Sequence, residues 1–490
     1  MDADVAIIGA GFGGLCAAIQ LQRAGFIDYL VFDAGDDVGG TWRDNSYPGC
    51  ACDVPSHLYS FSFAPNPNWS DTFSGQREIW EYLRACADGF GIRPRLRLRH
   101  EVLGAEWDER ERRWIVATGG GEYRARVLIS AAGPLSDPSI PDIPGLADFR
   151  GTVFHSARWR HDHDLAGRRV AVIGTGASAV QFVPQIQPVV RRLTLFQRTP
   201  AWVVPRLSRR ITRAERFAFR HVPGAQRAVR AGLYLARDAM AVGFLHPRIN
   251  RLASRVALRR LHRAVPDPEL CAKLTPGYTM GCKRVLVSND YYPALGKDNV
   301  DVVTAPIARL DEDGVVTADG AHHPADTLIL GTGFHVTDPP IVDRVRGRGG
   351  RLLAEAWTPN MRAYRGTAVA GFPNLFLLLG PNTGLGHTSV VLMMEAQVRS
   401  VVRALRHMRA RGCTAIEPTP EAQRRWNDEL DQKMAGTVWM TGCSSWYLDA
   451  SGRNTTVWPG YVTGFRLRTR GFRADDFTAL PAATPVRSRR

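Results

Sequence analysis

An α/β fold with two Rossmann-like, dinucleotide-binding domains is predicted by three features of the sequence. An apolar strand, a glycine-rich turn and an apolar helix follow one another from Asp4 to Leu21, and the same order returns from Arg169 to Val183. Two later apolar strands, in 326–333 and 374–380, also end on glycine. Such repeated units build parallel sheets covered by helices. We therefore expect two such domains, the first discontinuous, with a helical insertion in the second.

The first glycine turn contains Gly9, Gly11 and Gly14 at the spacing of a dinucleotide fingerprint. Glycines at these positions let the backbone approach a pyrophosphate that lies at the positive end of the following helix. The next strand, 29–32, ends on Asp33, about twenty residues after the last of these glycines. A carboxylate there accepts hydrogen bonds from ribose hydroxyls. Because an acid suits a nucleotide without a 2′-phosphate, the first nucleotide is predicted to be FAD.

The second glycine turn is followed by a strand that ends differently. The predicted cofactor-binding residues of this turn are Gly174, Thr175, Gly176, Ala177, Ser178 and Ala179. After the strand 193–196, the chain continues with Arg198 and Thr199 rather than with an acid. A guanidinium can bind a 2′-phosphate through two parallel hydrogen bonds, whereas a carboxylate would repel it. The second nucleotide is therefore predicted to be NADPH.

Length and charge limit the classes of function. A chain of 490 residues is long enough for two or three domains. Its net charge of +16 is unusual, but no nucleic-acid-binding module accompanies it. We attribute the charge to an arginine-rich composition and to a site for a phosphate-bearing cofactor, and we expect no nucleic-acid partner.

The eight cysteines form neither a Cys-x-x-Cys pair nor a zinc-ligand spacing. This pattern argues against disulfide reductase chemistry and against a metal site, so no metal is expected and the thiols are predicted to be reduced. The sequence shows no secretory leader before the first strand and no apolar run of about twenty residues. We therefore expect a cytoplasmic protein.

Between Arg206 and Arg263, arginines and apolar residues alternate with almost no acids. The periodicity predicts two or three amphipathic helices inserted into the second domain, over about 206–270. Such helices can form a lid, an oligomer interface or a surface that lies on an anionic membrane. Membrane contact is the least favoured of the three, and the sequence does not indicate the oligomeric state.

Four prolines between Pro134 and Pro144 indicate a stiff crossover of the kind found at a domain boundary. The predicted organisation is a first part of the FAD domain in 1–145, an NADPH domain in 146–365, and a second part of the FAD domain with a C-terminal loop in 366–480. The tail, 481–490, is predicted to be disordered.

Two further motifs have more specific spacing. Residues 39–53 follow the order Gly-Gly-x-Trp-x4-Tyr-Pro-Gly-x3-Asp, and residues 149–159 follow Phe-x-Gly-x3-His-x3-Trp. Both resemble motifs of the type I Baeyer-Villiger monooxygenases, class B flavoprotein monooxygenases that insert an oxygen atom beside a ketone carbonyl. Arg160 departs from the family pattern, which has proline or aspartate at this position. The resemblance covers nearly the whole chain apart from the arginine-rich insertion and the tail.

The resemblance implies roles for individual residues. Those expected to contact FAD are Gly40, Thr41, Trp42, Tyr59 and Val102, with Asp53 beside the flavin. Those expected to contact NADP are Gln181, Lys283, Arg284 and Trp446, with Lys283 reaching the phosphate and Arg284 entering the active site. Those expected to couple the two domains are Phe149, Gly151, His155 and Trp159.

The resemblance also implies a reaction. NADPH would reduce FAD, and the reduced flavin would combine with O2 to give a C4a-peroxyflavin that converts a ketone to an ester or lactone. Arg284 is then the predicted catalytic cation, since a guanidinium keeps its charge at working pH, and Asp53 would orient it. Two alternatives remain open: an amine or sulfide monooxygenase of the same fold, and a non-catalytic basic protein that binds a membrane or nucleic acid.

Overall fold

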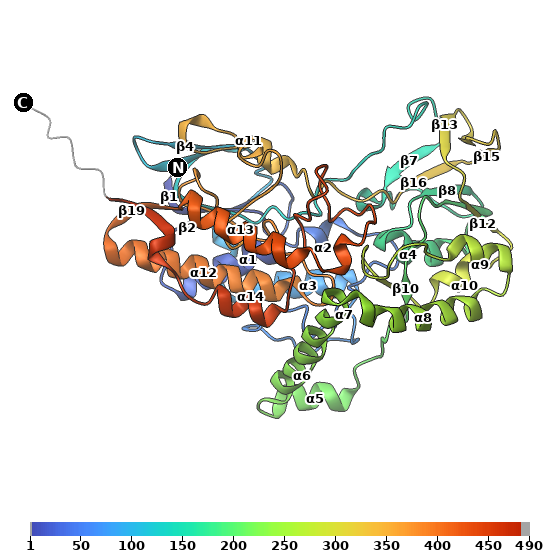
Figure 1. The fold of residues 1–490 in the computed structure, drawn as a ribbon, viewed down its shortest axis with the longest axis horizontal. Helices are drawn as coiled ribbons and strands as arrows, with labels where there is room; N and C mark the ends of the chain where they lie inside the picture. The colour runs from blue at the N-terminus through green and yellow to red at the C-terminus, as the bar shows by residue number, and fades with distance from the viewer. Residues whose placement is uncertain (1, 482–490) are drawn as a thin grey trace, which may run out of the picture.

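Two lobes, each built around one β-sheet, lie side by side in the computed structural model, which describes residues 2–481 (Figure 1). The N-terminal strand lies in the first lobe, and the chain returns to that lobe for its last helices. The tail for which disorder is predicted falls, from residue 482 on, outside the described residues.

The sheet of the first lobe has the order β17-β4-β5-β6-β1-β2-β3, and β18 also pairs with β6. Its strands are β1 (Asp2–Ile8), β2 (Tyr29–Asp33), β3 (Leu96–Leu98), β4 (Val102–Asp108), β5 (Arg113–Thr118), β6 (Gly121–Ser130), β17 (Val345–Arg346) and β18 (Leu375–Leu377). Successive side chains of β1 enter two different cores, because Val5 and Ile7 face one side of the sheet and Ala6 and Ile8 the other. A strand buried on both faces explains the continuous apolar run in the sequence.

Helices α1 (Phe12–Arg23), α3 (Gln76–Gly89) and α12 (Val390–Arg411) pack into one of these cores. The C-terminal segment adds β19 (Cys413–Pro418), α13 (Pro420–Met434), α14 (Val462–Arg468) and β20 (Phe477–Pro481). The short helices α2 (Thr41–Asp44) and α11 (Leu353–Ala356) complete this lobe. Within residues 2–481, none of the helices combines the length and the apolar character that crossing a bilayer requires.

The second lobe contains a parallel sheet of order β12-β9-β8-β16-β7. Its strands are β7 (Thr152–His155), β8 (Arg169–Ile173), β9 (Arg192–Phe196), β12 (Val300–Val303) and β16 (Thr327–Leu330). Helices α4 (Ala177–Ile186) and α10 (Tyr291–Leu295) cover one face. Smaller elements are the pair β10 (Val203–Val204) and β11 (Leu286–Val287), and the antiparallel sheet β13 (Ile307–Asp311), β14 (Gly314–Thr317) and β15 (His322–Pro324).

The insertion contains more helices than the sequence pattern predicts. Between residues 206 and 264 the chain forms four, namely α5 (Arg213–His221), α6 (Ala225–Ala239), α7 (Ala241–Leu245) and α8 (Pro247–Ala264), and α9 (Pro268–Leu274) follows. The prediction of two or three was wrong because only Met240 separates α6 from α7, and because apolar residues lie on both faces of α8.

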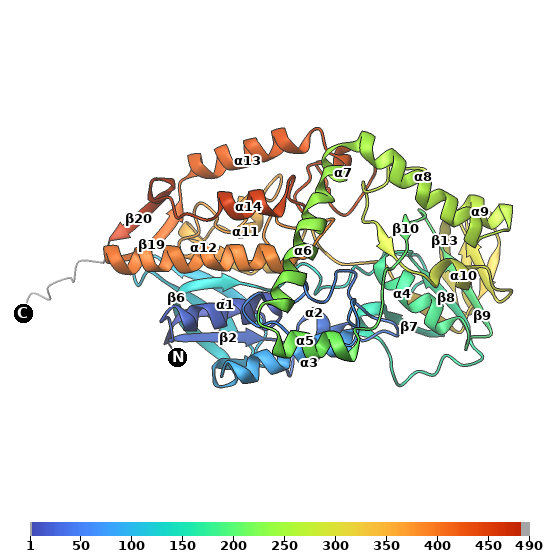
Figure 2. The same cartoon turned by 90° about the horizontal axis from the view of Figure 1, so that it is seen from below.

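This insertion packs against both lobes (Figure 2). In α6, the Gln226 side-chain amide donates to the Asn66 carbonyl oxygen at 2.6 Å, and the Asp238 carboxylate accepts from the Val462 amide at 2.6 Å, both in the first lobe. In α8, Leu261 is buried in the core of the second lobe. The insertion therefore bridges the two sheets rather than extending one of them.

Candidate active site

The first glycine turn joins β1 to α1 and has no room for a Cβ at Gly9 or at Gly14. Gly9 has a φ of +94°, and a Cβ placed on it would lie 2.5 Å from the Ala131 carbonyl oxygen. A Cβ on Gly14 would overlap the Gly9 carbonyl oxygen. Gly11 is the N-cap of α1 and supplies no capping side chain. The first amides of α1 are thus left for an anion, as a pyrophosphate site requires.

Asp33 ends β2 and is buried against this turn. Its carboxylate accepts hydrogen bonds from the amides of Ala10 at 2.7 Å and Gly35 at 2.8 Å, and it forms an ion pair with Arg43 at 2.7 Å. A carboxylate has about four acceptor positions. Asp33 therefore holds the turn in place and keeps acceptor capacity for a ribose hydroxyl.

Residues of the 39–53 motif lie beside the same turn. Gly40 has a φ of +51°, and a Cβ on it would be 3.2 Å from Gly11 Cα, so the two loops touch through their backbones. Trp42 is buried, and its indole Nε1 donates to the Tyr59 hydroxyl at 3.1 Å. Burial raises the pKa of Tyr59. Val102, at the start of β4, is buried in the core on the other side of the sheet.

Asp53 and Arg284, 231 residues apart in the sequence, form an ion pair. Arg284 Nε and Nη2 both donate to Asp53 Oδ2, at 3.0 and 2.5 Å. Both side chains stay partly exposed, at 27% for Arg284 and 23% for Asp53. The carboxylate raises the pKa of Arg284 further above its usual range. The arrangement fixes a permanent positive charge that an incoming molecule can reach.

The second glycine turn joins β8 to α4 in the same way as the first. Gly174 has a φ of +109°, and a Cβ on it would overlap the Gly331 carbonyl oxygen at the end of β16. Gly176 is the N-cap of α4 without a capping side chain. The Thr175 hydroxyl donates to the Thr199 carbonyl oxygen at 3.0 Å, which ties the turn to the segment after β9. The segment that contains Arg198 is thereby held beside the turn.

Arg198 is exposed, and its charge acts on Lys283. The pKa of Lys283 is lowered by burial and by the nearby Arg198 guanidinium. Two cations that come together from separate parts of the chain create a positive site that favours a phosphate group.

Two other predicted NADP contacts have different partners in the structure. Gln181 is engaged with the first lobe: its side-chain amide accepts from the Tyr47 hydroxyl at 3.0 Å and donates to the Ala51 carbonyl oxygen at 2.9 Å. Trp446 is 44% exposed and packs against Tyr447, with ring centroids 4.3 Å apart. Their contacts with NADP stay predictions, as do those of Ala177, Ser178 and Ala179.

The 149–159 motif lies at the edge of the second sheet. Gly151 has no space for a Cβ, which would lie 2.5 Å from the Phe149 ring. His155 ends β7, is buried, and packs edge to face on Phe334 at 5.7 Å, where the chain leaves this sheet. Burial lowers the pKa of His155 to about 4, so the ring is neutral at pH 7. Trp159 packs on Phe182 of α4, with ring centroids 5.3 Å apart.

Two residues near the ion pair were missed by sequence reasoning. Tyr447 is buried, and its pKa is raised by burial against the opposing effect of the Arg284 charge. Arg237 of α6 is half-buried; burial lowers its pKa, and the Asp53 carboxylate acts in the opposite direction. The adjacent Trp446 motif could have indicated Tyr447, whereas nothing distinguishes Arg237 from the other arginines of the insertion.

The cysteine prediction needs a correction. Cys282 and Cys443 form a disulfide bond with Cα atoms 6.2 Å apart, so the expectation of reduced thiols was wrong for this pair. Neither spacing nor composition indicates it, because 161 residues separate the two cysteines. The bond ties the segment that precedes Lys283 and Arg284 to the loop of Trp446 and Tyr447.

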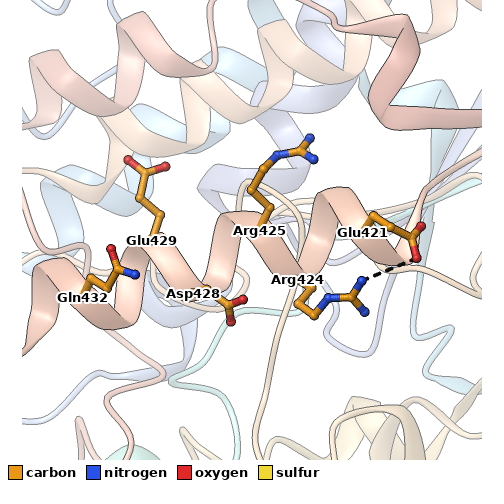
Figure 3. A pocket seen from close by; sticks show the side chains of 6 residues that line it. All are labelled: Glu421, Arg424, Arg425, Asp428, Glu429 and Gln432. Carbon is orange, nitrogen blue, oxygen red and sulfur yellow. Dashed lines mark ion pairs between the residues drawn. The ribbon is translucent and has the colours of Figure 1, made fainter.

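Two other clusters do not form a comparable site. The hollow on α13 is lined by charged or polar side chains of that one helix, and two of them, Glu421 and Arg424, already form an ion pair at 3.5 Å (Figure 3). These residues are Glu421, Arg424, Arg425, Asp428, Glu429 and Gln432. Among the described residues, Asp311, Asp313 and His322 could together hold a metal ion, but they lie on an exposed sheet edge and already pair with one another.

Two glycine turns, each at a helix N-terminus, and one partly exposed guanidinium held by a carboxylate define an oxidoreductase of the two-dinucleotide class. Residues 7–75 match the model of an NAD(P)-binding Rossmann-like domain. The chain is 54% identical over 486 residues to a Baeyer-Villiger monooxygenase of Streptomyces coelicolor, covering 98% of this chain and 94% of that protein. It is 47% identical over 485 residues to a Baeyer-Villiger monooxygenase of Pseudomonas aeruginosa, covering 98% and 92%.

Solved structures agree with these relatives. Cyclohexanone monooxygenase from Rhodococcus sp. Phi1 bound to NADP+ superimposes with a TM-score of 0.89 at 31% identity, covering 98% of this chain and all of that one. An oxidised steroid monooxygenase bound to NADP gives a TM-score of 0.87 at 33% identity, with 98% and 100% coverage. This chain belongs to the Baeyer-Villiger monooxygenases. The family, enzyme class and fold class that the sequence predicts are confirmed.

Proposed function

We propose that this protein is an FAD-containing monooxygenase that uses NADPH and O2 to convert a ketone to an ester or lactone. The observation that carries the proposal is the Arg284–Asp53 ion pair, which joins segments 231 residues apart and leaves the guanidinium partly exposed. A ketone and O2 are the small-molecule partners. The absence of a nucleic-acid partner and a cytoplasmic location, where NADPH is abundant, remain part of the proposal.

The residues of the first turn fit FAD. Gly9 and Gly14 leave a cradle that a Cβ would fill, and the uncapped N-terminus of α1 offers amides to a pyrophosphate. When bound and reduced, FAD supplies the chemistry that activates O2. The chain's own residues bind and orient FAD. Asp33 accepts a hydrogen bond from the ribose, and the hydrogen-bonded side chains of Trp42 and Tyr59 lie beside the first glycine turn.

The residues of the second turn fit NADPH. The uncapped N-terminus of α4 offers amides to its pyrophosphate, and Arg198 with Lys283 offers positive charge to its 2′-phosphate. No acid follows β9 to repel that phosphate. The residue at the position of Asp33 in the first unit is Gln197, whose side-chain amide donates to the Lys273 carbonyl oxygen at 2.7 Å. This arrangement favours NADPH over NADH.

Arg284 then acts on the ketone. A guanidinium cannot lose its proton at working pH, so it stabilises the negative charge that develops on the ketone oxygen as the carbonyl is attacked. Asp53 holds the guanidinium through two hydrogen bonds and sets its direction. The buried Tyr447 and a second cation, Arg237, lie close enough to this pair for its charges to act on them.

The test is product analysis with the purified, FAD-loaded enzyme and NADPH. Linear, cyclic and aromatic ketones are offered in parallel with an alkyl aryl sulfide and a tertiary amine. We expect at least one ketone to yield an ester or lactone heavier by one oxygen atom, with one NADPH consumed for each product. Oxygenation of the sulfide or the amine without any ester or lactone would contradict the proposal.

A further inference from the structure

The helical insertion exposes an unusual share of large apolar side chains. Of the eighteen that are exposed among residues 2–481, nine lie between residues 207 and 256. They are Leu207, Phe217, Val222, Val229, Leu235, Met240, Ile249, Leu252 and Val256. About a tenth of the chain thus carries half of these side chains. Single exposed apolar residues are ordinary, but a concentration of them marks a surface that contacts something else.

Helix α8 shows how these side chains are arranged. Its buried residues are Ala257 and Leu261, and Leu261 lies in the core of the second lobe. Ile249, Leu252 and Val256 follow one another at intervals of three and four, which places them on one stripe of the helix. They are 52%, 70% and 60% exposed. The helix therefore has a second apolar stripe that residues 2–481 leave largely exposed.

Arginines surround this stripe. Residues 206–263 contain fifteen arginines and only two acids, Glu215 and Asp238. Both acids are already engaged, Glu215 with Arg209 and Asp238 with the first turn of α14. On α8 itself, the exposed arginines are Arg248, Arg251, Arg255, Arg259 and Arg263, and none of them forms an ion pair with a described residue. The surface has a strong positive charge without internal compensation.

We propose that the outer surface of α5, α6 and α8 docks on a membrane rich in anionic lipid. Exposed apolar side chains that alternate with arginines are what an interfacial helix uses, since the first enter the acyl region and the second bind headgroup phosphates. These helices lie along one side of the molecule, the side turned to the viewer in Figure 2. The proposal does not depend on the reaction that the enzyme catalyses.

Other occupants fit this surface less well. A second copy of the chain, docked symmetrically, would bring the same arginines face to face without acids between them. Nucleic acid would satisfy the arginines but would leave aliphatic side chains such as Leu252 and Ile249 without an apolar partner. A lipid surface supplies both negative charge and an apolar interior.

The experiment measures sedimentation of the full-length, FAD-loaded enzyme with lipid vesicles. One set of vesicles is phosphatidylcholine alone, and the other contains about one quarter phosphatidylglycerol, at an ionic strength of about 0.15 M. We expect binding to the anionic vesicles only. The double variant Leu252→Glu with Val256→Glu should bind them at least about tenfold more weakly, because it removes apolar contact and adds repelling charge.

A matched control uses equally exposed apolar residues elsewhere, Ile27→Glu with Leu467→Glu, which are 61% and 63% exposed in the wild type. This control should bind vesicles as the wild type does. All variants should oxidise NADPH with a water-soluble ketone at the wild-type rate, which verifies that they fold.

Four results would overturn the proposal. The first is no binding of the wild type to anionic vesicles, and the second is an equal loss of binding in the control. The third is duplex DNA that binds the wild type more tightly than vesicles do while the Leu252→Glu, Val256→Glu variant binds DNA unchanged. The fourth is a change of oligomeric mass in that variant on size exclusion, which would assign the surface to a second copy.

Discussion

The two glycine turns share one topology but differ in tightness and in charge. At the third position of the motif the first turn has Gly14, whose Cβ would overlap the Gly9 carbonyl oxygen, whereas the second turn has Ala179. The strand after the first turn ends on buried Asp33, which is bonded to the turn itself. The strand after the second turn is followed by exposed Arg198, which forms no ion pair with a described residue.

The difference shows that the same strand-turn-helix unit can bind one nucleotide permanently and another reversibly. The first turn is fixed by Asp33 and Arg43 and suits a cofactor that stays bound. At the second turn the charge that selects the nucleotide lies on exposed Arg198, which suits a cosubstrate that exchanges. The following predictions test this comparison, from the largest expected effect to the smallest.

The first turn should not tolerate a methyl group. In Gly14→Ala the new Cβ would overlap the backbone of Gly9, so α1 must move and the pyrophosphate site is lost. We expect a protein purified without bound flavin, measured by its visible absorbance. The control is Gly176→Ala in the second turn, where the nearest atom to the new Cβ is 4.0 Å away and FAD should be retained. Full flavin content in Gly14→Ala would remove the distinction between the turns.

The second turn should lose selectivity when its cation is removed. Arg198→Ala should raise the KM for NADPH by about tenfold to a hundredfold and change that for NADH little, since only NADPH has the 2′-phosphate. Steady-state kinetics with both nucleotides measures this. Arg191→Ala, an exposed arginine at the other end of β9, is the control and should leave both values unchanged. An equal loss for NADPH and NADH would contradict the phosphate assignment.

The histidine at the edge of the second sheet should make stability depend on pH. The pKa of His155 is about 4 in the folded chain and about 6.5 when unfolded, so the unfolded state binds more protons between these values. Stability should therefore fall by about 2 kcal/mol as the pH drops from about 6.5 to about 4.

The comparison is made with His155→Gln, whose thermal midpoint should fall less steeply over this range. His57, in the first lobe, also has a pKa lowered to about 4 by burial, so part of the slope should remain. An exposed control, His221→Gln, should keep the full slope. If His155→Gln and the wild type lost the same stability between pH 6.5 and about pH 4, the claim that His155 is buried as a neutral ring would be wrong.

Local patterns predicted both turns correctly because their glycines, strands and helices lie within about forty residues of one another. The same local pattern identified Asp33 at the end of the second strand of the first unit and Arg198 after the second strand of the second unit. The Asp53–Arg284 pair joins segments 231 residues apart, and only the family resemblance placed these two residues at one site. Composition alone could not have done so.

What the sequence could not indicate depends on tertiary packing. The Cys282–Cys443 bond, the approach of Arg237 to Asp53 and the burial of Tyr447 all arise where the insertion and the C-terminal loop meet the two lobes. The predicted number of helices in the insertion was too low because a single residue, Met240, separates α6 from α7. The exposed apolar stripe of α8 could not be told from a buried one in sequence. Periodicity reports that a helix has an apolar face, not what covers it.

The most direct test of the account is the kinetics of Arg284→Ala beside Arg284→Lys. If a fixed guanidinium charge drives ketone oxygenation, Arg284→Ala should bind FAD and be reduced by NADPH, yet form ester or lactone about a thousandfold more slowly. Arg284→Lys should recover part of that rate, because an ammonium keeps the charge but loses the forked bond to Asp53. Ketone oxygenation at the wild-type rate by Arg284→Ala would contradict the account.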